Sequence, residues 1–209
     1  MKIVFDFGGV LFNWQPSRLL RREIPEVAHD EASAALWVER FFQGYEGDWG
    51  EFDRGRLSID ELVPRIAART GLGLHEVQRV VDGVPHELQP LADTVTLLRR
   101  LRDQGRELFF LSNMPEPFAA HLEREHDLVG WFGDGVFSAR VGLVKPEAAI
   151  FELAARRFGA APADLLFIDD HLPNVQAATA CGWGAIQYTN AAAVATELSR
   201  RGLLRRDEA

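Results

Sequence analysis

The sequence is poor in cysteine, with Cys181 the only one among 209 residues. An internal disulfide needs two thiols, so a small disulfide-stabilised secreted scaffold is excluded. No apolar run approaches the ~18 to 20 residues that a membrane-spanning helix requires. The residues after Met1 become charged too soon to form a secretory signal sequence. We therefore expect a cytoplasmic protein with no membrane partner.

Positive charge is also scarce, because 23 Lys and Arg residues stand against 31 Asp and Glu residues, for a net charge of -8. Binding to nucleic acid relies on clustered positive charge, so no nucleic-acid partner is expected. The hydrophobic fraction of 47% and the charged fraction of 26% are typical of a globular protein. The length allows one core with a small accessory lobe, and we expect a monomer or a homodimer.

Short apolar runs punctuated by glycine predict strands that are buried on both faces. These runs occupy residues 3–5, 108–111, 136–137, 165–168 and 185–188. Stretches with helical periodicity lie between or after the later runs, at residues 91–102, 117–125, 147–158, 173–181 and 191–203. Alternating strands and helices predict an α/β fold in which helices cover both faces of a parallel sheet.

Residues 14–87 break this alternation, because they contain helical patterns and no convincing strand. The clearest helical patterns cover residues 34–42, 59–68 and 74–81. We therefore predict a helical insertion at 14–87, placed after the first strand. The remaining residues, 1–13 and 88–209, are then predicted to form the core domain.

Two of the predicted strands are followed by residues that could act as a nucleophile or bind an anion. Asp6 follows the first strand and precedes Gly8 and Gly9, whose flexible backbone could aim N–H groups at an oxyanion. Asp followed by glycine is also ordinary turn chemistry. Ser112 and Asn113 follow the second strand and could donate to phosphate oxygens, or could instead cap the next helix.

Two further clusters carry charge. Lys145 precedes a proline and could neutralise developing negative charge, although an exposed surface lysine is the plainer interpretation. Asp169 and Asp170 end the strand predicted at 165–168. Adjacent buried acids are costly without a compensating cation or hydrogen bonds, and carboxylate oxygens suit Mg²⁺. Ligands bind at the carboxyl edge of open parallel sheets, so all four clusters are expected to meet there.

The order and spacing of these clusters resemble the motif set of the haloacid dehalogenase superfamily from residue 2 to about residue 188. The resemblance implies a Rossmann-like parallel sheet with a helical cap inserted after the first strand. It also implies a Mg²⁺-dependent phosphatase that hydrolyses a small organic phosphoester through an aspartyl-phosphate intermediate. The implied roles are Asp6 as nucleophile and metal ligand, Gly8 and Asp170 as metal ligands, Gly9, Ser112 and Asn113 as phosphate contacts, Lys145 as charge clamp and phosphate contact, Asp169 as a supporting or alternative ligand, and Asn174 as a partner that orients Lys145.

One position departs from the usual phosphatase motif, which has a second aspartate two residues after the nucleophile where this sequence has Gly8. That aspartate is the general acid and base. The nearby amides of Asn13 and Gln15 cannot replace a titrating acid. We therefore expect esters with good leaving groups to react best. The sequence resembles sugar-phosphate phosphatases such as the bacterial alpha-D-glucose-1-phosphate phosphatase, which also lacks this acid, in cap length and in residues 52–55.

Two alternatives remain open beside the phosphatase. A metal-independent 2-haloacid dehalogenase uses the same nucleophile, and a non-catalytic protein of this fold would bind a metabolite or protein through the insertion. In the insertion, an aromatic and acidic cluster either lines the substrate entrance or fills the core of the insertion itself. The cluster comprises Tyr45, Glu46, Asp48, Trp49 and Phe52. His171, next to the paired acids, is a candidate substrate contact.

Overall fold

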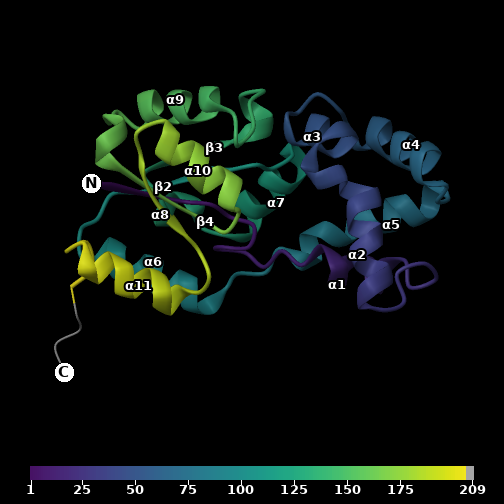
Figure 1. Cartoon of the computed structure of the whole chain (residues 1–209), viewed down its shortest axis with the longest axis horizontal. Helices are drawn as coiled ribbons and strands as arrows, with labels where there is room; N and C mark the ends of the chain where they lie inside the picture. The colour runs from purple at the N-terminus through teal and green to yellow at the C-terminus, as the bar shows by residue number, and fades with distance from the viewer. Residues whose placement is uncertain (206–209) are drawn as a thin grey trace.

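The computed structural model describes residues 1–205, in which a parallel sheet forms the centre of the larger lobe (Figure 1). The strand order is β3-β2-β1-β4-β5, and β1 pairs with β2 on one side and β4 on the other. This confirms the α/β fold with a parallel sheet. The strands are β1 (Lys2–Phe5), β2 (Leu108–Ser112), β3 (Asp134–Phe137), β4 (Leu165–Asp169) and β5 (Gly184–Gln187).

Helices cover both faces of the sheet, because side chains of a strand alternate between the faces. Ile3 and Phe5 of β1 belong to the apolar cluster that includes α6 (Ala92–Asp103) and α11 (Ala191–Arg200). Val4 belongs to the cluster on the other face, with α9 (Ala148–Arg157) and α10 (Leu172–Ala180). Figure 1 shows these two helix pairs on opposite sides of the strands. The remaining helices of this lobe are α7 (Glu116–Glu125) and α8 (Leu128–Trp131), with short 3-10 helices η2 (Ser138–Arg140) and η3 (Pro162–Asp164).

The fifth strand differs from its prediction in position and in burial. It covers Gly184–Gln187, one residue earlier than the predicted run, and only Ile186 is fully buried. The reason is its place in the sheet, because β5 is an edge strand with a neighbour on one side only.

Five helices between β1 and α6 form the second lobe, at the right of Figure 1. Two of them begin with reciprocal capping boxes, Asp30 with Ser33 and Ser58 with Glu61. We refer to this helical lobe as the cap. The prediction that residues 14–87 form a separate domain stays a prediction. Residues 206–209, which belong to the predicted core domain, lie outside the described residues. The helices are α1 (Pro16–Glu23), α2 (Glu31–Phe42), α3 (Gly47–Asp53), α4 (Ile59–Thr70) and α5 (Leu74–Glu87), with the 3-10 helix η1 (Gln43–Tyr45).

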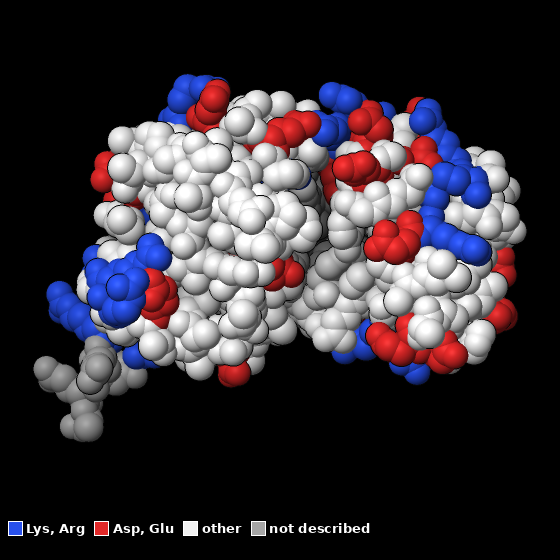
Figure 2. Space-filling view, viewed as in Figure 1, with Lys and Arg blue, Asp and Glu red and all other residues white. Residues whose placement is uncertain are grey.

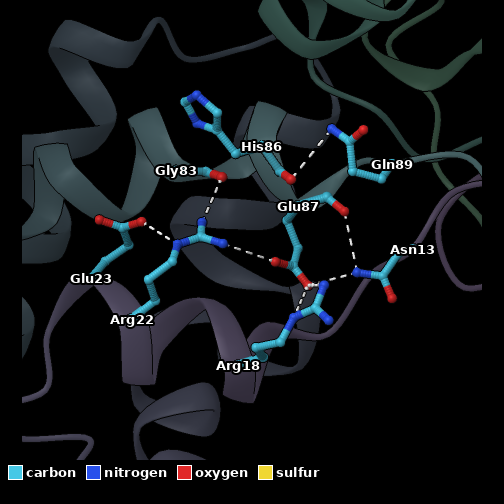
Figure 3. A network of polar contacts seen from close by, with 8 residues as sticks. All are labelled: Asn13, Arg18, Arg22, Glu23, Gly83, His86, Glu87 and Gln89. Atoms are coloured by element: carbon cyan, nitrogen blue, oxygen red, sulfur yellow. Dashed lines mark hydrogen bonds and ion pairs between the residues drawn. The ribbon is translucent and has the colours of Figure 1, made fainter.

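The two chain segments that join the lobes are tied to each other (Figure 3). Glu87 is fully buried at the end of α5 and accepts hydrogen bonds from Asn13 Nδ2 at 2.7 Å and Arg18 Nε at 3.1 Å. Arg22 approaches its other carboxylate oxygen at 3.3 Å. The backbone N–H of Asn13 also donates to Gln89 O at 2.7 Å. These contacts fix the connection between the lobes.

None of the helices described for residues 1–205 combines the length and the apolar character that crossing a membrane requires.

Candidate functional site

Three charged side chains predicted for the site meet at the carboxyl edge of the sheet. Asp6 follows β1, Asp169 ends β4, and Lys145 follows η2. Lys145 Nζ lies 2.8 Å from Asp6 Oδ1 and 2.6 Å from Asp169 Oδ2. All three residues are buried, so Lys145 is a buried clamp between two carboxylates and not a surface lysine.

Asn113 fixes the backbone that carries this lysine. Its side-chain Nδ2 donates to Lys145 O at 3.0 Å, and its Oδ1 accepts from Lys145 N at 2.8 Å. The following peptide bond, Lys145–Pro146, is cis. Asn113 also lines the cavity described below, but its side-chain amide is occupied by the Lys145 backbone.

Asp169 is surrounded by donors. Besides Lys145, it accepts from His171 N at 2.8 Å and from Asn174 Nδ2 at 3.1 and 3.0 Å. Asn174 therefore orients Lys145 indirectly, through Asp169. The side chain of Asp170 is exposed and receives no hydrogen bond from any other residue in the described part of the chain. Asp170 is thus the freer of the two acids to bind a ligand.

The donor set fits a hard divalent cation. Asp6, Asp169 and Asp170 each offer a carboxylate oxygen, and these oxygens lie within 4.8 Å of one another. Because the Asp169 oxygens are already occupied, Asp6 and Asp170 remain as the natural ligands, and oxygen ligands are those that Mg²⁺ prefers. Gly9 has a φ of 76°, and a Cβ there would collide with the Asp170 carboxylate. Glycine is needed where these two loops approach.

The charges at this edge are unbalanced, with three carboxylates around one ammonium. Burial raises the pKa of Asp6 to about 8; Lys145 opposes this shift, while Asp169 and Asp170 add to it. Partial burial and the neighbouring Asp169 also raise the pKa of Asp170. Burial disfavours the charged form of Lys145, but Asp169 and Asp6 outweigh burial and hold its pKa above the usual value. Another positive charge would stabilise the ionised carboxylates.

Ser112 offers a hydroxyl that lacks a partner. Its Oγ is fully buried at the end of β2 and makes no hydrogen bond within residues 1–205. It does not cap the following helix, because α7 begins after Pro115 with no side-chain cap. Leaving a buried hydroxyl unsatisfied costs about 1–3 kcal/mol, and a bound oxyanion could satisfy it.

A cavity of about 720 Å³ lies between this edge and the cap, and Figure 2 shows the hollow between the two lobes. Gly8, Asp6, Lys145, Asp170, His171 and Asn174 belong to its lining, whereas Gly9, Ser112 and Asp169 do not. Much of the remaining wall is aromatic or aliphatic. These apolar lining residues are Trp14, Tyr45, Trp49, Val84, Leu88, Met114, Phe118 and Val144.

Some residues of the aromatic and acidic cluster predicted in the cap line the cavity, and others fill the core of the cap or pair with its helices. Tyr45, Glu46 and Trp49 line the cavity. Phe52 is buried and packs against Trp49 in the apolar core, while Asp48 forms an ion pair with an arginine of α4. Tyr45 accepts a hydrogen bond from Trp14 Nε1 at 2.8 Å, which joins two aromatic rings of the wall.

Sequence reasoning missed Asp53, the last residue of α3. It lines the cavity and is only 4% exposed. Burial raises its pKa to about 8, with Lys145 and Arg54 opposing and Asp6 adding to the shift. Gly55, two residues later, has a φ of 72° and packs so closely on Ala139 of the core that a Cβ would collide with it, so this glycine marks where the cap segment meets the core.

Comparison with known proteins identifies the family. A haloacid dehalogenase-like hydrolase model matches residues 3–182. A sesquiterpene phosphatase of Aspergillus oryzae is 29% identical over 199 residues, covering 93% of each chain. An (S)-2-haloacid dehalogenase of Pseudomonas fluorescens is 24% identical, covering 86% of this chain and 80% of that protein.

A crystal structure of a haloacid dehalogenase family enzyme from Bacteroides thetaiotaomicron, in complex with magnesium and inorganic phosphate, has the same fold. It superposes with a TM-score of 0.70 at 21% identity, covering 89% of this chain and 92% of that one. The superfamily predicted from the four strand-end clusters is therefore confirmed. The chain is a hydrolase that belongs to the haloacid dehalogenase-like hydrolase family.

Proposed function

We propose that this protein is a Mg²⁺-dependent phosphatase that hydrolyses a phosphate monoester through an aspartyl-phosphate on Asp6. The observation that carries the proposal is the excess of carboxylates at the cavity floor. Asp6 and Asp170 present free oxygens beside a single buried ammonium. The crystal structure from Bacteroides thetaiotaomicron, which contains magnesium and inorganic phosphate, supports the same assignment by analogy.

Each residue of the site has a separate role in the proposed reaction. A carboxylate oxygen of Asp6 forms a bond to phosphorus while the bond from phosphorus to the ester oxygen breaks, and water then attacks the phosphoenzyme and restores Asp6. Lys145 holds Asp6 in place and offsets the charge of the transferring group. The buried Ser112 hydroxyl has no partner among residues 1–205 and is free to donate to a phosphate oxygen, whereas the N–H of Gly9, predicted to contact phosphate, already donates to Phe12 O at 2.8 Å. Bound by Asp6, Asp170 and the Gly8 carbonyl, Mg²⁺ would supply positive charge that keeps Asp6 ionised and polarises the phosphate.

The cavity walls favour an organic group with considerable apolar surface over the sugar phosphate suggested by the sequence. The two cations of the cavity are already engaged: Lys145 with Asp6 and Asp169, and Arg54 with Glu147. Aromatic and aliphatic side chains form much of the remaining wall, which suits a hydrocarbon body. The Aspergillus oryzae relative is a sesquiterpene phosphatase, which agrees with this choice. A cytoplasmic location and a monomeric or homodimeric state stay predictions.

The dehalogenase alternative has relatives of its own, but the site argues against it. A dehalogenase that works without a metal has no bound cation to offset additional carboxylates beside its nucleophile. Here Asp170 adds a third negative charge next to Asp6 without a side-chain partner among residues 1–205. The Asp170 charge helps to raise the pKa of Asp6, so without a bound cation it opposes ionisation of the nucleophile.

The test is turnover of p-nitrophenyl phosphate and of a long-chain alkyl phosphate, with Mg²⁺ and in chelator, beside halide release from 2-chloropropionate. We expect Mg²⁺-dependent phosphate release that Asp6→Asn abolishes and that Asp60→Asn, an exposed cap acid, leaves unchanged. Halide release in chelator, without phosphate release, would establish the dehalogenase instead.

A further inference from the structure

We propose that Asp53 of the cap is the general acid and base of the reaction, in place of the acid that is missing at Gly8. The inference rests on the proposed phosphatase function and names the residue that carries the proton. It changes the expectation of strong leaving-group dependence, which assumed that no other acid reaches the site.

The position of Asp53 is fixed from the core side. Its carbonyl oxygen accepts a hydrogen bond from Ser138 Oγ at 2.6 Å, and Ser138 Oγ in turn accepts from Met114 N at 2.8 Å. The next residue, Arg54, forms two bonds to Glu147, at 3.0 and 2.6 Å. Thus the cap segment that carries Asp53 is held against the core through Ser138 and Glu147.

The side-chain carboxyl group of Asp53 makes no contact that stabilises the fold. Asp53 is 4% exposed, lines the same cavity as Asp6, and has no side-chain hydrogen bond or ion pair among the residues that the structure describes. The charged groups that act on it are Lys145 and Asp6 from the core and Arg54 from its own segment. A buried acid of this kind stays protonated near neutral pH, as a proton donor must.

Three other titratable groups of the cavity are less suitable. Glu147 and Glu51 are paired with Arg54, and hydrogen bonds from Arg54 lower the pKa of Glu147. Burial raises the pKa of Tyr45 to about 12, far above the range of an efficient acid and base. His171 is exposed and lines the same cavity, so it remains the competitor that the experiment includes.

The proton balance is complete with Asp53 alone. As Asp6 bonds to phosphorus, the protonated Asp53 gives its proton to the departing ester oxygen, and the alcohol leaves neutral. The resulting Asp53 carboxylate takes a proton from water while the water oxygen attacks the phosphoenzyme. Phosphate departs, Asp6 is free, and Asp53 is again protonated.

The experiment measures kcat/KM for phosphate monoesters graded by the pKa of the leaving alcohol, from p-nitrophenyl through phenyl to alkyl phosphate, at saturating Mg²⁺. The variants are Asp53→Asn, Asp53→Ala, His171→Gln and the exposed cap control Asp60→Asn. Wild type is expected to depend weakly on the leaving group. Asp53→Asn and Asp53→Ala should lose ~10² to 10⁴ in rate with the alkyl ester and much less with the p-nitrophenyl ester.

The outcomes separate the two proposals. The slope is that of log kcat/KM against the pKa of the leaving alcohol. The role of Asp53 would be overturned, with the phosphatase intact, if both Asp53 variants lost the same rate with every ester or kept the wild-type slope. It would also be overturned if the slope became steeper in His171→Gln alone. If wild type releases no phosphate from any ester, the proposed function fails and the role of Asp53 fails with it. Two substitutions at Asp53 guard against one that does not fold.

Discussion

Replacement of Asp53 by asparagine should stabilise the folded protein as the pH rises. The substitution keeps the size and polarity of the side chain and removes only its ability to ionise. The pKa of Asp53 is about 8 in the folded protein, against 3.8 for an unperturbed aspartate. Since Asp53 is buried without a direct partner for its negative charge, ionisation opposes folding.

The magnitude follows from the difference between the two pKa values. Below pH 3.8 both states hold the proton, and Asp53 has no cost. Between pH 3.8 and about 8 the unfolded chain releases the proton and the folded protein retains it, so the free energy of unfolding falls by about 1.4 kcal/mol per pH unit. At pH 7 the cost is therefore on the order of 4 kcal/mol, and it levels off above pH 8.

Urea unfolding of metal-free wild type, Asp53→Asn and Asp60→Asn at pH 5, 7 and 9 measures this effect. The advantage of Asp53→Asn over wild type should grow by about 3 kcal/mol between pH 5 and pH 7. Asp60→Asn should show no such growth, because Asp60 is exposed. An advantage that is constant or shrinks with pH would mean that Asp53 is ionised in the folded protein, and the reasoning would fail.

Three other substitutions test the supports of the site. Lys145→Met leaves two buried carboxylates without their cation, so the free energy of unfolding in urea should fall by about 3–5 kcal/mol; an unchanged value would contradict the clamp. Glu87→Gln removes the buried charge that joins the two linkers, and should cost about 1–3 kcal/mol in the same assay, whereas no loss would show that the network is incidental. Gly9→Ala pushes against the Asp170 carboxylate, so the Mg²⁺ concentration for half-maximal activity should rise about 10- to 100-fold, and an unaltered Mg²⁺ response would refute that contact.

The sequence was sufficient for the central sheet because the strands carry their own signal. β1, β2 and β4 are fully or almost fully buried apolar runs, and each is followed at once by polar groups. In a parallel sheet these ends lie at one edge, so the proximity of Asp6 to Asp169 could be inferred without coordinates. The edge strand β5 was less well predicted, since burial on one side only weakens the apolar pattern.

Hydrogen-bond partners within the site could not be predicted in the same way. Asn113 was expected to contact phosphate and Asn174 to orient Lys145, but the sequence did not indicate the groups that their amides bind, which are the Lys145 backbone and the Asp169 carboxylate. The hydrogen-bond partner of a side-chain amide depends on differences of tenths of an ångström in the geometry of the surrounding loops. Sequence spacing does not contain that information.

Asp53 was missed for a different reason, which bears on how the enzyme is built. An acid two residues after Asp6 would belong to the core and would face the nucleophile whether or not the cap is closed. Asp53 belongs to α3 and reaches the cavity because Ser138 and Glu147 hold its segment against the core. Proton transfer would then require the closed cap, the same state that shields the phosphoenzyme from bulk water. If Asp53 is the proton donor, its place in the cap rather than in the core would make the proposed chemistry conditional on closure of the cap over the substrate.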